Sequence, residues 1–118
     1  MTGARTVVVP TLDHGDVTLP EPAWCAGHAE GPAEYRADVH HAAPVPVPAG
    51  LVDVDVELVA FPYGGTPVPV SIHVEIVIPG ATLAPDGLRE YAAGLVERAA
   101  LLRELADRLA VLRAGGVW

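Results

Sequence analysis

Residues 51–60 read Leu-Val-Asp-Val-Asp-Val-Glu-Leu-Val-Ala, and residues 68–78 read Val-Pro-Val-Ser-Ile-His-Val-Glu-Ile-Val-Ile. Apolar and polar residues alternate in both runs, which is the period of a half-buried strand. In the first run the apolar positions from Val52 to Leu58 fall on one side, and the acidic residues fall on the other. The link between the runs contains the glycines and prolines of a hairpin loop. We therefore expect an antiparallel hairpin over residues 51–78, with one buried face and one solvated, acidic face.

The C-terminal third of the chain carries a helical pattern. Leucine and alanine recur at spacings of three and four from Leu88 onward, which predicts an apolar stripe along a helix. Pro85 suits the first helical position, and Asp86 suits the positive end of the helix dipole. Gly115-Gly116 can end the helix. The sequence thus predicts one long amphipathic helix over residues 85–114.

Residues 1–20 suggest a second, N-terminal hairpin. Residues 5–9 (Arg-Thr-Val-Val-Val) and 16–19 (Asp-Val-Thr-Leu) are predicted to be strands, and the Asp-His-Gly sequence at 13–15 is suited to a tight turn. Pro10 and Pro20 should confine both strands to an edge or cut them short, because proline cannot donate to a sheet ladder.

Together these elements predict an α+β fold: a small antiparallel sheet of about four strands, in two hairpins, packed against the C-terminal helix. The length of 118 residues suggests a single domain over 1–118. Between the hairpins, residues 21–50 are rich in proline and lack a clear period, so we expect an irregular loop. Loops of this length inside a domain are generally functional or are fixed by something other than a sheet.

Charge and composition exclude some classes of partner. The net charge of -8 argues against nucleic-acid binding, which depends on clustered basic residues. The charges of residues 81–118 cancel, so the excess acid lies in residues 1–80. No stretch is apolar enough for a membrane span, and the N-terminus lacks a signal-peptide pattern, so we expect a cytoplasmic protein. The abundance of Ala, Gly, Pro, Arg and Val, with no lysine, indicates a GC-rich genome.

The loop holds the one cysteine of the chain and three of its five histidines. Zinc prefers tetrahedral nitrogen and sulfur ligands, and a Cys-x-x-His turn can present two of them. The candidate metal ligands are Cys25 and His28, then either His40 or His41, with His14 as a fourth. Neighbours in an extended chain point in opposite directions, so only one residue of the His40-His41 pair should ligate. An ion bound here would also explain why a long loop stays ordered.

Other interpretations of Cys25 remain open. It can be a small buried apolar residue beside solvated histidines. A Cys-His pair can also act as a nucleophile and its base, although the sequence identifies neither an orienting group nor an oxyanion hole. The acidic face of the second hairpin is a weaker candidate for cation binding or acid-base chemistry. Its residues are Asp53, Asp55, Glu57, His73 and Glu75.

Three stretches carry a resemblance to a known group: the Asp-His-Gly turn at 13–15, residues 21–28 (Glu-Pro-Ala-Trp-Cys-Ala-Gly-His) and a later histidine. From about residue 6 to 110 the chain resembles small actinobacterial proteins of unknown function, which have a Trp-Cys-x-x-His motif, then strands, then a C-terminal helix opened by Pro-Asp. Ala84 and Gly87 depart from the helix opening expected in that group. The resemblance implies an actinobacterial source and no specific activity.

The leading functional hypothesis is therefore a zinc-stabilised module that binds another protein or itself. The alternative is a small metal-dependent enzyme, in which three protein ligands leave a position for water. A third class is an acidic protein that mimics nucleic acid. The predicted helix, about 42 Å long at the standard rise, is longer than the sheet can cover. We therefore expect a homodimer formed through the C-terminal helix.

Overall fold

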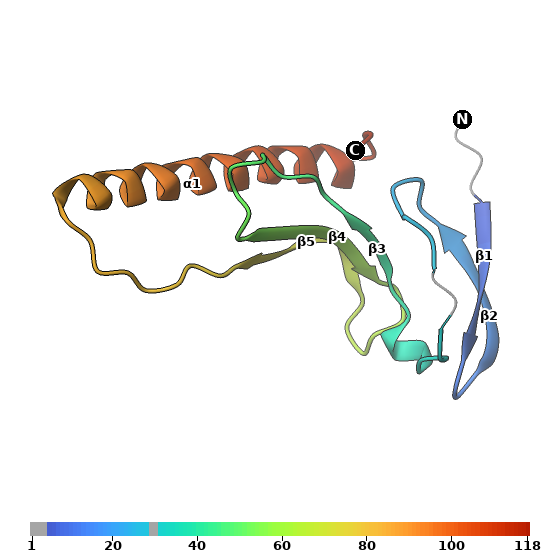
Figure 1. The fold of residues 1–118 in the computed structure, drawn as a ribbon. Coiled ribbons are helices and arrows are strands. Elements are labelled where there is room, and N and C mark those ends of the chain that lie inside the picture. The colour runs from blue at the N-terminus through green and yellow to red at the C-terminus, as the bar shows by residue number, and fades with distance from the viewer. Residues whose placement is uncertain (1–4, 29–30) are drawn as a thin grey trace. The chain divides into compact units, whose positions relative to one another are not determined.

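The computed structural model describes residues 5–28 and 31–118 (Figure 1). Residues 1–4 of the first predicted hairpin and residues 29–30 of the predicted loop lie outside the described part of the chain. The described residues form an α+β fold with two antiparallel sheets and one long helix, which confirms the predicted class. The elements are β1 (Arg5–Thr11), β2 (Gly15–Glu21), the 3-10 helix η1 (Arg36–Asp38), β3 (His41–Pro44), β4 (Val54–Phe61), β5 (Val68–Ile76) and α1 (Pro85–Arg113).

The chain divides into two compact units. The first contains Met1–Val45 and Glu57–His73, and the second contains Pro46–Val56 and Val74–Trp118. Among the described residues of the first unit, the most deeply buried side chains include Leu19, Val39 and Leu58. In the second unit Val56 and Leu105 are buried to a similar degree.

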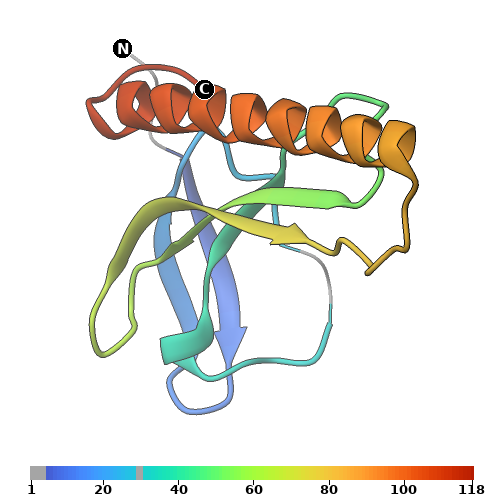
Figure 2. The same cartoon turned by 90° about the vertical axis from the view of Figure 1, so that its left-hand side faces the viewer.

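β1 and β2 form a two-stranded antiparallel sheet and lie side by side in both views (Figure 1; Figure 2). Both strands continue through the proline that was expected to limit them. The register pairs Thr6 with Pro20 and Pro10 with Asp16, so each proline sits inside the ladder. Because a two-stranded sheet has only edge strands, a proline can direct its missing N–H outward without breaking a hydrogen bond. The strand therefore extends to Glu21, which matters for the site described below.

The second sheet has three strands in the order β3-β4-β5. The β4-β5 hairpin was predicted, whereas β3 lies in the segment expected to be irregular. β3 pairs antiparallel with β4, with His41 opposite Ala60 and Pro44 opposite Glu57. Its sequence, His-Ala-Ala-Pro, has no β-branched residue and is too short to show a period. Only its pairing with β4 makes it a strand.

β4 starts three residues later than the alternating pattern indicates. A turn precedes it, in which the Leu51 N–H donates to Pro48 O and the Val54 N–H donates to Leu51 O. The turn buries Leu51 and leaves Val52 93% exposed, although the pattern placed Val52 on the buried face. From Val54 onward the alternation holds, because Val54, Val56 and Leu58 are all buried.

The helix α1 confirms the predicted C-terminal element. Pro85 occupies its first turn, and Ala84 provides no side-chain cap. At the other end, Gly115 has φ of 92°, and the Gly116 N–H donates to Val111 O while the Gly115 N–H donates to Leu112 O. These two bonds form a Schellman motif, which needs a residue such as glycine in the left-handed region. Over the described residues, no helix is both long enough and apolar enough to cross a membrane.

Within the second unit, an ion pair fixes α1 to the residues before β4. Arg98 donates two hydrogen bonds to the Asp53 carboxylate, one of them from Nε to Oδ2 at 3.1 Å. The hydrogen bonds from Arg98 hold the pKa of Asp53 below its usual value, despite the opposing effect of desolvation. Asp53 was predicted to belong to a solvated strand face; instead it lies in the turn and anchors the helix.

Candidate metal centre

Glu21 is the last residue of β2, and its side chain is almost fully buried. Along β2 the more buried positions alternate, so Val17, Leu19 and Glu21 share one face. A buried carboxylate is costly unless it is hydrogen-bonded. The partners that satisfy Glu21 come from two later segments of the chain.

Cys25 follows Glu21 in a tight turn. Its N–H donates to Pro22 O at 3.1 Å, and the next residue, Ala26, donates to Ala42 O in β3 at 3.0 Å. Gly27 then adopts φ of 101°, a conformation that favours glycine and turns the chain back on itself. This turn brings the His28 ring over the Cys25 thiol.

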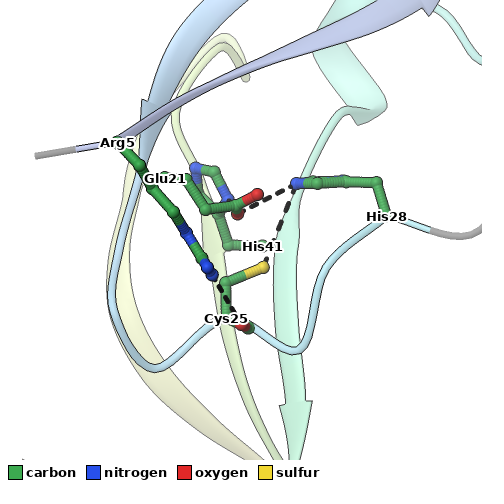
Figure 3. Close-up of polar contacts among 5 residues, drawn as sticks. All are labelled: Arg5, Glu21, Cys25, His28 and His41. Atoms are coloured by element: carbon green, nitrogen blue, oxygen red, sulfur yellow. Dashed lines mark hydrogen bonds and ion pairs between the residues drawn. The ribbon is translucent and has the colours of Figure 1, made fainter.

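His28 faces both Glu21 and Cys25 through one nitrogen. Nε2 lies 3.1 Å from Glu21 Oε1 and 3.9 Å from Cys25 Sγ (Figure 3). The side chain of His28 is 19% exposed, against 5% for the side chain of Glu21. His28 is therefore the member of the group with access to solvent.

His41, the first residue of β3, completes the group. Its Nδ1 lies 2.9 Å from Glu21 Oε1, and its ring meets that of Trp24 edge-on at 6.2 Å. Because an ionised carboxylate only accepts hydrogen bonds, the two ring nitrogens that face Glu21 act as donors. One carboxylate oxygen thus holds two imidazoles together.

The electrostatics follow from this arrangement. Burial by itself would raise the pKa of Glu21, but hydrogen bonds from Cys25, His28 and His41 outweigh it and the pKa lies below the ordinary value. Burial, followed by the hydrogen bond with Glu21, raises the pKa of the Cys25 thiol. Arg5 lies beside the group, with Nη2 3.4 Å from Cys25 O (Figure 3).

The donor atoms lie close enough together to hold one metal ion. One ligand atom from each of Glu21, Cys25, His28 and His41 lies within 4.8 Å of every other. Ligands at the usual zinc distances of about 2.0–2.3 Å are about 3.3–3.8 Å apart in a tetrahedron. The separations of 2.9, 3.1 and 3.9 Å bracket that range.

The other two predicted ligands lie elsewhere. His40 stacks on Phe61 with ring centroids 5.1 Å apart, and its Nδ1 donates to Asp38 O at 3.0 Å. His14 lies in the β1–β2 turn and pairs with Asp13 at 3.0 Å. As expected for neighbours in an extended chain, His40 and His41 point to different surroundings. The structure therefore brings together Cys25, His28 and His41.

Sequence reasoning missed Glu21. The signal was present, because Glu21 continues the alternation of Val17 and Leu19 and lies four residues before Cys25. It was overlooked because Pro20 was expected to end the strand. Over residues 5–28 and 31–118, the acidic face predicted for the second hairpin forms no comparable cluster of metal-binding side chains.

Comparison with known proteins agrees with the resemblance to a group of unknown function. Neither the curated proteins nor the solved structures give a significant match. Residues 6–111 match a family described as Domain of unknown function (DUF6907), and the chain therefore belongs to that family.

Proposed function

We propose that this chain is a zinc-stabilised protein-interaction module. One zinc ion is bound by Cys25 Sγ, His28 Nε2, His41 Nδ1 and a carboxylate oxygen of Glu21. The observation that carries the proposal is the convergence of these four donor atoms, from β2, the following turn and β3, to within 4.8 Å of one another.

The donor types favour zinc over other biological ions. Magnesium and calcium take oxygen ligands, so a thiolate with two imidazoles does not suit them. Zinc accepts sulfur, nitrogen and carboxylate oxygen in one tetrahedral site. Zinc binding requires a thiolate, so the ion must displace the proton that the raised pKa keeps on Cys25.

The geometry favours a structural ion over a catalytic one. Four protein donors complete a tetrahedron, whereas a catalytic zinc keeps one position for water. Glu21, Cys25 and His41 are 8%, 5% and 5% exposed, so solvent has little access to the ion from the side that they form. The raised pKa of Cys25 is also the reverse of what activates a nucleophilic thiol.

The ion would stabilise a segment that is otherwise held by few bonds. Between β2 and β3, the backbone bond from Ala26 to Ala42 links the Cys25 turn to β3. Further along, Leu12 donates to Glu34 O, and the Arg36 N–H donates to Asp13. An ion bound by Glu21, Cys25, His28 and His41 would link the two ends of this segment. The free energy of binding the ion would then contribute to the free energy of folding. The ordered segment then offers a fixed surface to a partner.

Metal content tests this proposal directly. Tag-free protein should contain about one zinc per chain by native mass spectrometry, as one four-ligand site requires. Cys25→Ala and His41→Ala should each lose the ion, and chelation should lower the melting temperature of the wild type only. His40→Ala and His14→Ala are matched controls, because they remove the same side chain outside the group. If the wild type binds no zinc, or if the controls lose it as readily, the site is wrong.

A further inference from the structure

The outer edge of β1 can be identified from its prolines. The ladder with β2 runs without interruption from Arg5–Glu21 to Thr11–Gly15, although Pro10 and Pro20 cannot donate. In an antiparallel ladder, hydrogen-bonded pairs alternate with pairs that exchange no bonds. Both prolines must therefore belong to pairs that exchange no hydrogen bonds. Thr6 and Val8 lie four and two residues before Pro10, so their N–H groups point in the same direction as the position of the missing N–H of Pro10. These N–H groups therefore point away from β2.

The same edge already pairs with the chain at its far end. Leu12 lies two residues after Pro10, so its N–H faces the same outer edge, and it donates to Glu34 O at 2.8 Å. Thr11 and Glu34 form an isolated parallel bridge. Across residues 5–28 and 31–118, no backbone hydrogen bond to the outward N–H of Val8 is present. Within the part of the chain that the structure describes, the edge is thus paired at Leu12 and open at Val8.

A hollow of about 690 Å³ lies along this open edge. Val8, Val9 and Pro10 all line it, and three consecutive strand residues point to alternate faces. A hollow that touches all three must therefore run beside the backbone, at the edge of the strand. Its other described lining residues come from 27–28, 31–34, 39–40 and Ala42. The volume is typical of ligand sites, which span about 300–1,000 Å³.

The lining of the hollow is apolar with hydrogen-bond acceptors. Val8, which is 56% exposed, and the buried Val39 contribute apolar walls. The Glu34 carboxylate has no hydrogen-bond or ion-pair partner in the part of the chain that the structure describes. His40 donates through Nδ1 to Asp38 O, so the Nε2 of the neutral ring is an acceptor. Neither lysine nor arginine is among the described lining residues, so the hollow suits a positively charged group.

We propose that the edge of β1 and the adjoining hollow bind an extended, basic peptide segment of a partner protein. The segment adds to β1 as a third strand, accepts a hydrogen bond from the Val8 N–H, and places a lysine or arginine beside Glu34. Strand addition is a common mode of peptide recognition, and a two-stranded sheet gains stability from a third strand. The inference rests on the proposed function, because the wall formed by residues 27–28, 31–34, 39–40 and Ala42 belongs to the segment that zinc would order.

Peptide selection provides the probe. Random heptapeptides displayed on phage are selected against the zinc-loaded full-length chain, and the enriched peptides are synthesised and titrated by fluorescence anisotropy. We expect alternating sequences with at least one lysine or arginine. Backbone amide shifts should change at β1 and at residues 31–34. Absence of enrichment, or shifts confined to other surfaces, would overturn the proposal.

Two proline variants separate the two edges of the sheet. Val8→Pro removes an outward N–H from β1 without breaking a bond to β2, and should weaken the selected peptide about tenfold or more. Thr18→Pro is the matched control, because Thr18 pairs with Val8 and directs its N–H to the outer edge of β2. It should bind the peptide like the wild type. Equal affinities for Val8→Pro and the wild type would overturn strand addition.

Glu34→Gln tests the charge without a backbone change. It should weaken basic peptides several-fold and reduce the salt dependence of binding. If Val8→Pro does not fold, unchanged binding by Glu34→Gln together with unchanged shifts at β1 still refutes the site. Removal of zinc with a chelator distinguishes the proposed zinc site from the proposed peptide site. A chain that binds zinc but no peptide refutes only the inference. Binding that survives chelation and remains sensitive to Val8→Pro supports the edge site and refutes the role of zinc.

Discussion

Oε1 of Glu21 lies 2.9 Å from Nδ1 of His41, although twenty residues separate them in the sequence. The contact joins the end of one sheet to the start of a strand in the other. Because the same oxygen also accepts from His28, the carboxylate holds the positions of both imidazoles. Glu21 should therefore contribute strongly to metal binding.

Glu21→Gln should weaken zinc binding by about 10–100-fold, because the amide keeps the shape but replaces a charged carboxylate ligand with a neutral amide oxygen, which binds the ion less strongly. Competition with a chromophoric chelator measures the affinity. Glu34→Gln is the matched control, since Glu34 lies outside the group and should keep wild-type affinity. Equal affinity in both variants would show that Glu21 is not a ligand.

Leu58→Ala should destabilise the protein by about 2–5 kcal/mol, because the side chain is 1% exposed and its loss leaves a cavity. Val52→Ala should change the free energy of unfolding by less than about 0.5 kcal/mol, because Val52 lies outside the strand and is almost fully exposed. Denaturant unfolding measures both. The sequence pattern placed both residues on the same buried face. A similar loss of unfolding free energy in the two variants would therefore contradict the exposed position of Val52.

Asp53→Asn should lower the melting temperature at neutral pH, since it removes the ion pair with Arg98. Arg98 depresses the pKa of Asp53 in the folded state. The pair therefore contributes stability above the unfolded value of about 3.9, and this stability is lost as the pH falls through the lower folded pKa. The difference in melting temperature between wild type and variant should vanish in strong acid.

Asp86→Asn is the control for this pH profile, because Asp86 and Arg89 form an ion pair whose side chains are 96% and 76% exposed. Exposed pairs contribute little, so this variant should follow the wild type at every pH. A difference between wild type and Asp53→Asn that does not depend on pH would contradict the ionic origin of the stabilisation.

Self-association through α1 remains a prediction. On the helix, Leu101 and Leu105 are buried within the chain, whereas Leu95, Leu102 and Val111 are exposed. If the helix forms a dimer, Leu102→Arg should dissociate it at micromolar concentrations, because the charge would have to be buried. Sedimentation velocity measures the change. A wild type that stays monomeric over this range would exclude the dimer.

The sequence alone determined the elements whose signal is local. The alternation from Val54 to Leu58 specifies a half-buried strand because side chains in a strand point to alternate faces. Pro85 and the Gly115-Gly116 pair bound the helix because each acts through its own backbone conformation. The proximity of Cys25 to His28 was likewise predictable, since only one turn separates them.

Only the tertiary structure decided what depends on distant partners. β3 exists because β4 supplies its hydrogen bonds, and β2 passes through Pro20 because the position of its missing N–H faces away from β1. The choice of His41 over His40, and the recruitment of Glu21, follow from the pairing of those strands. The candidate metal centre is built from separate segments, so the distances between its side chains depend on how the strands pack. The local pattern of the sequence carries no information about those distances.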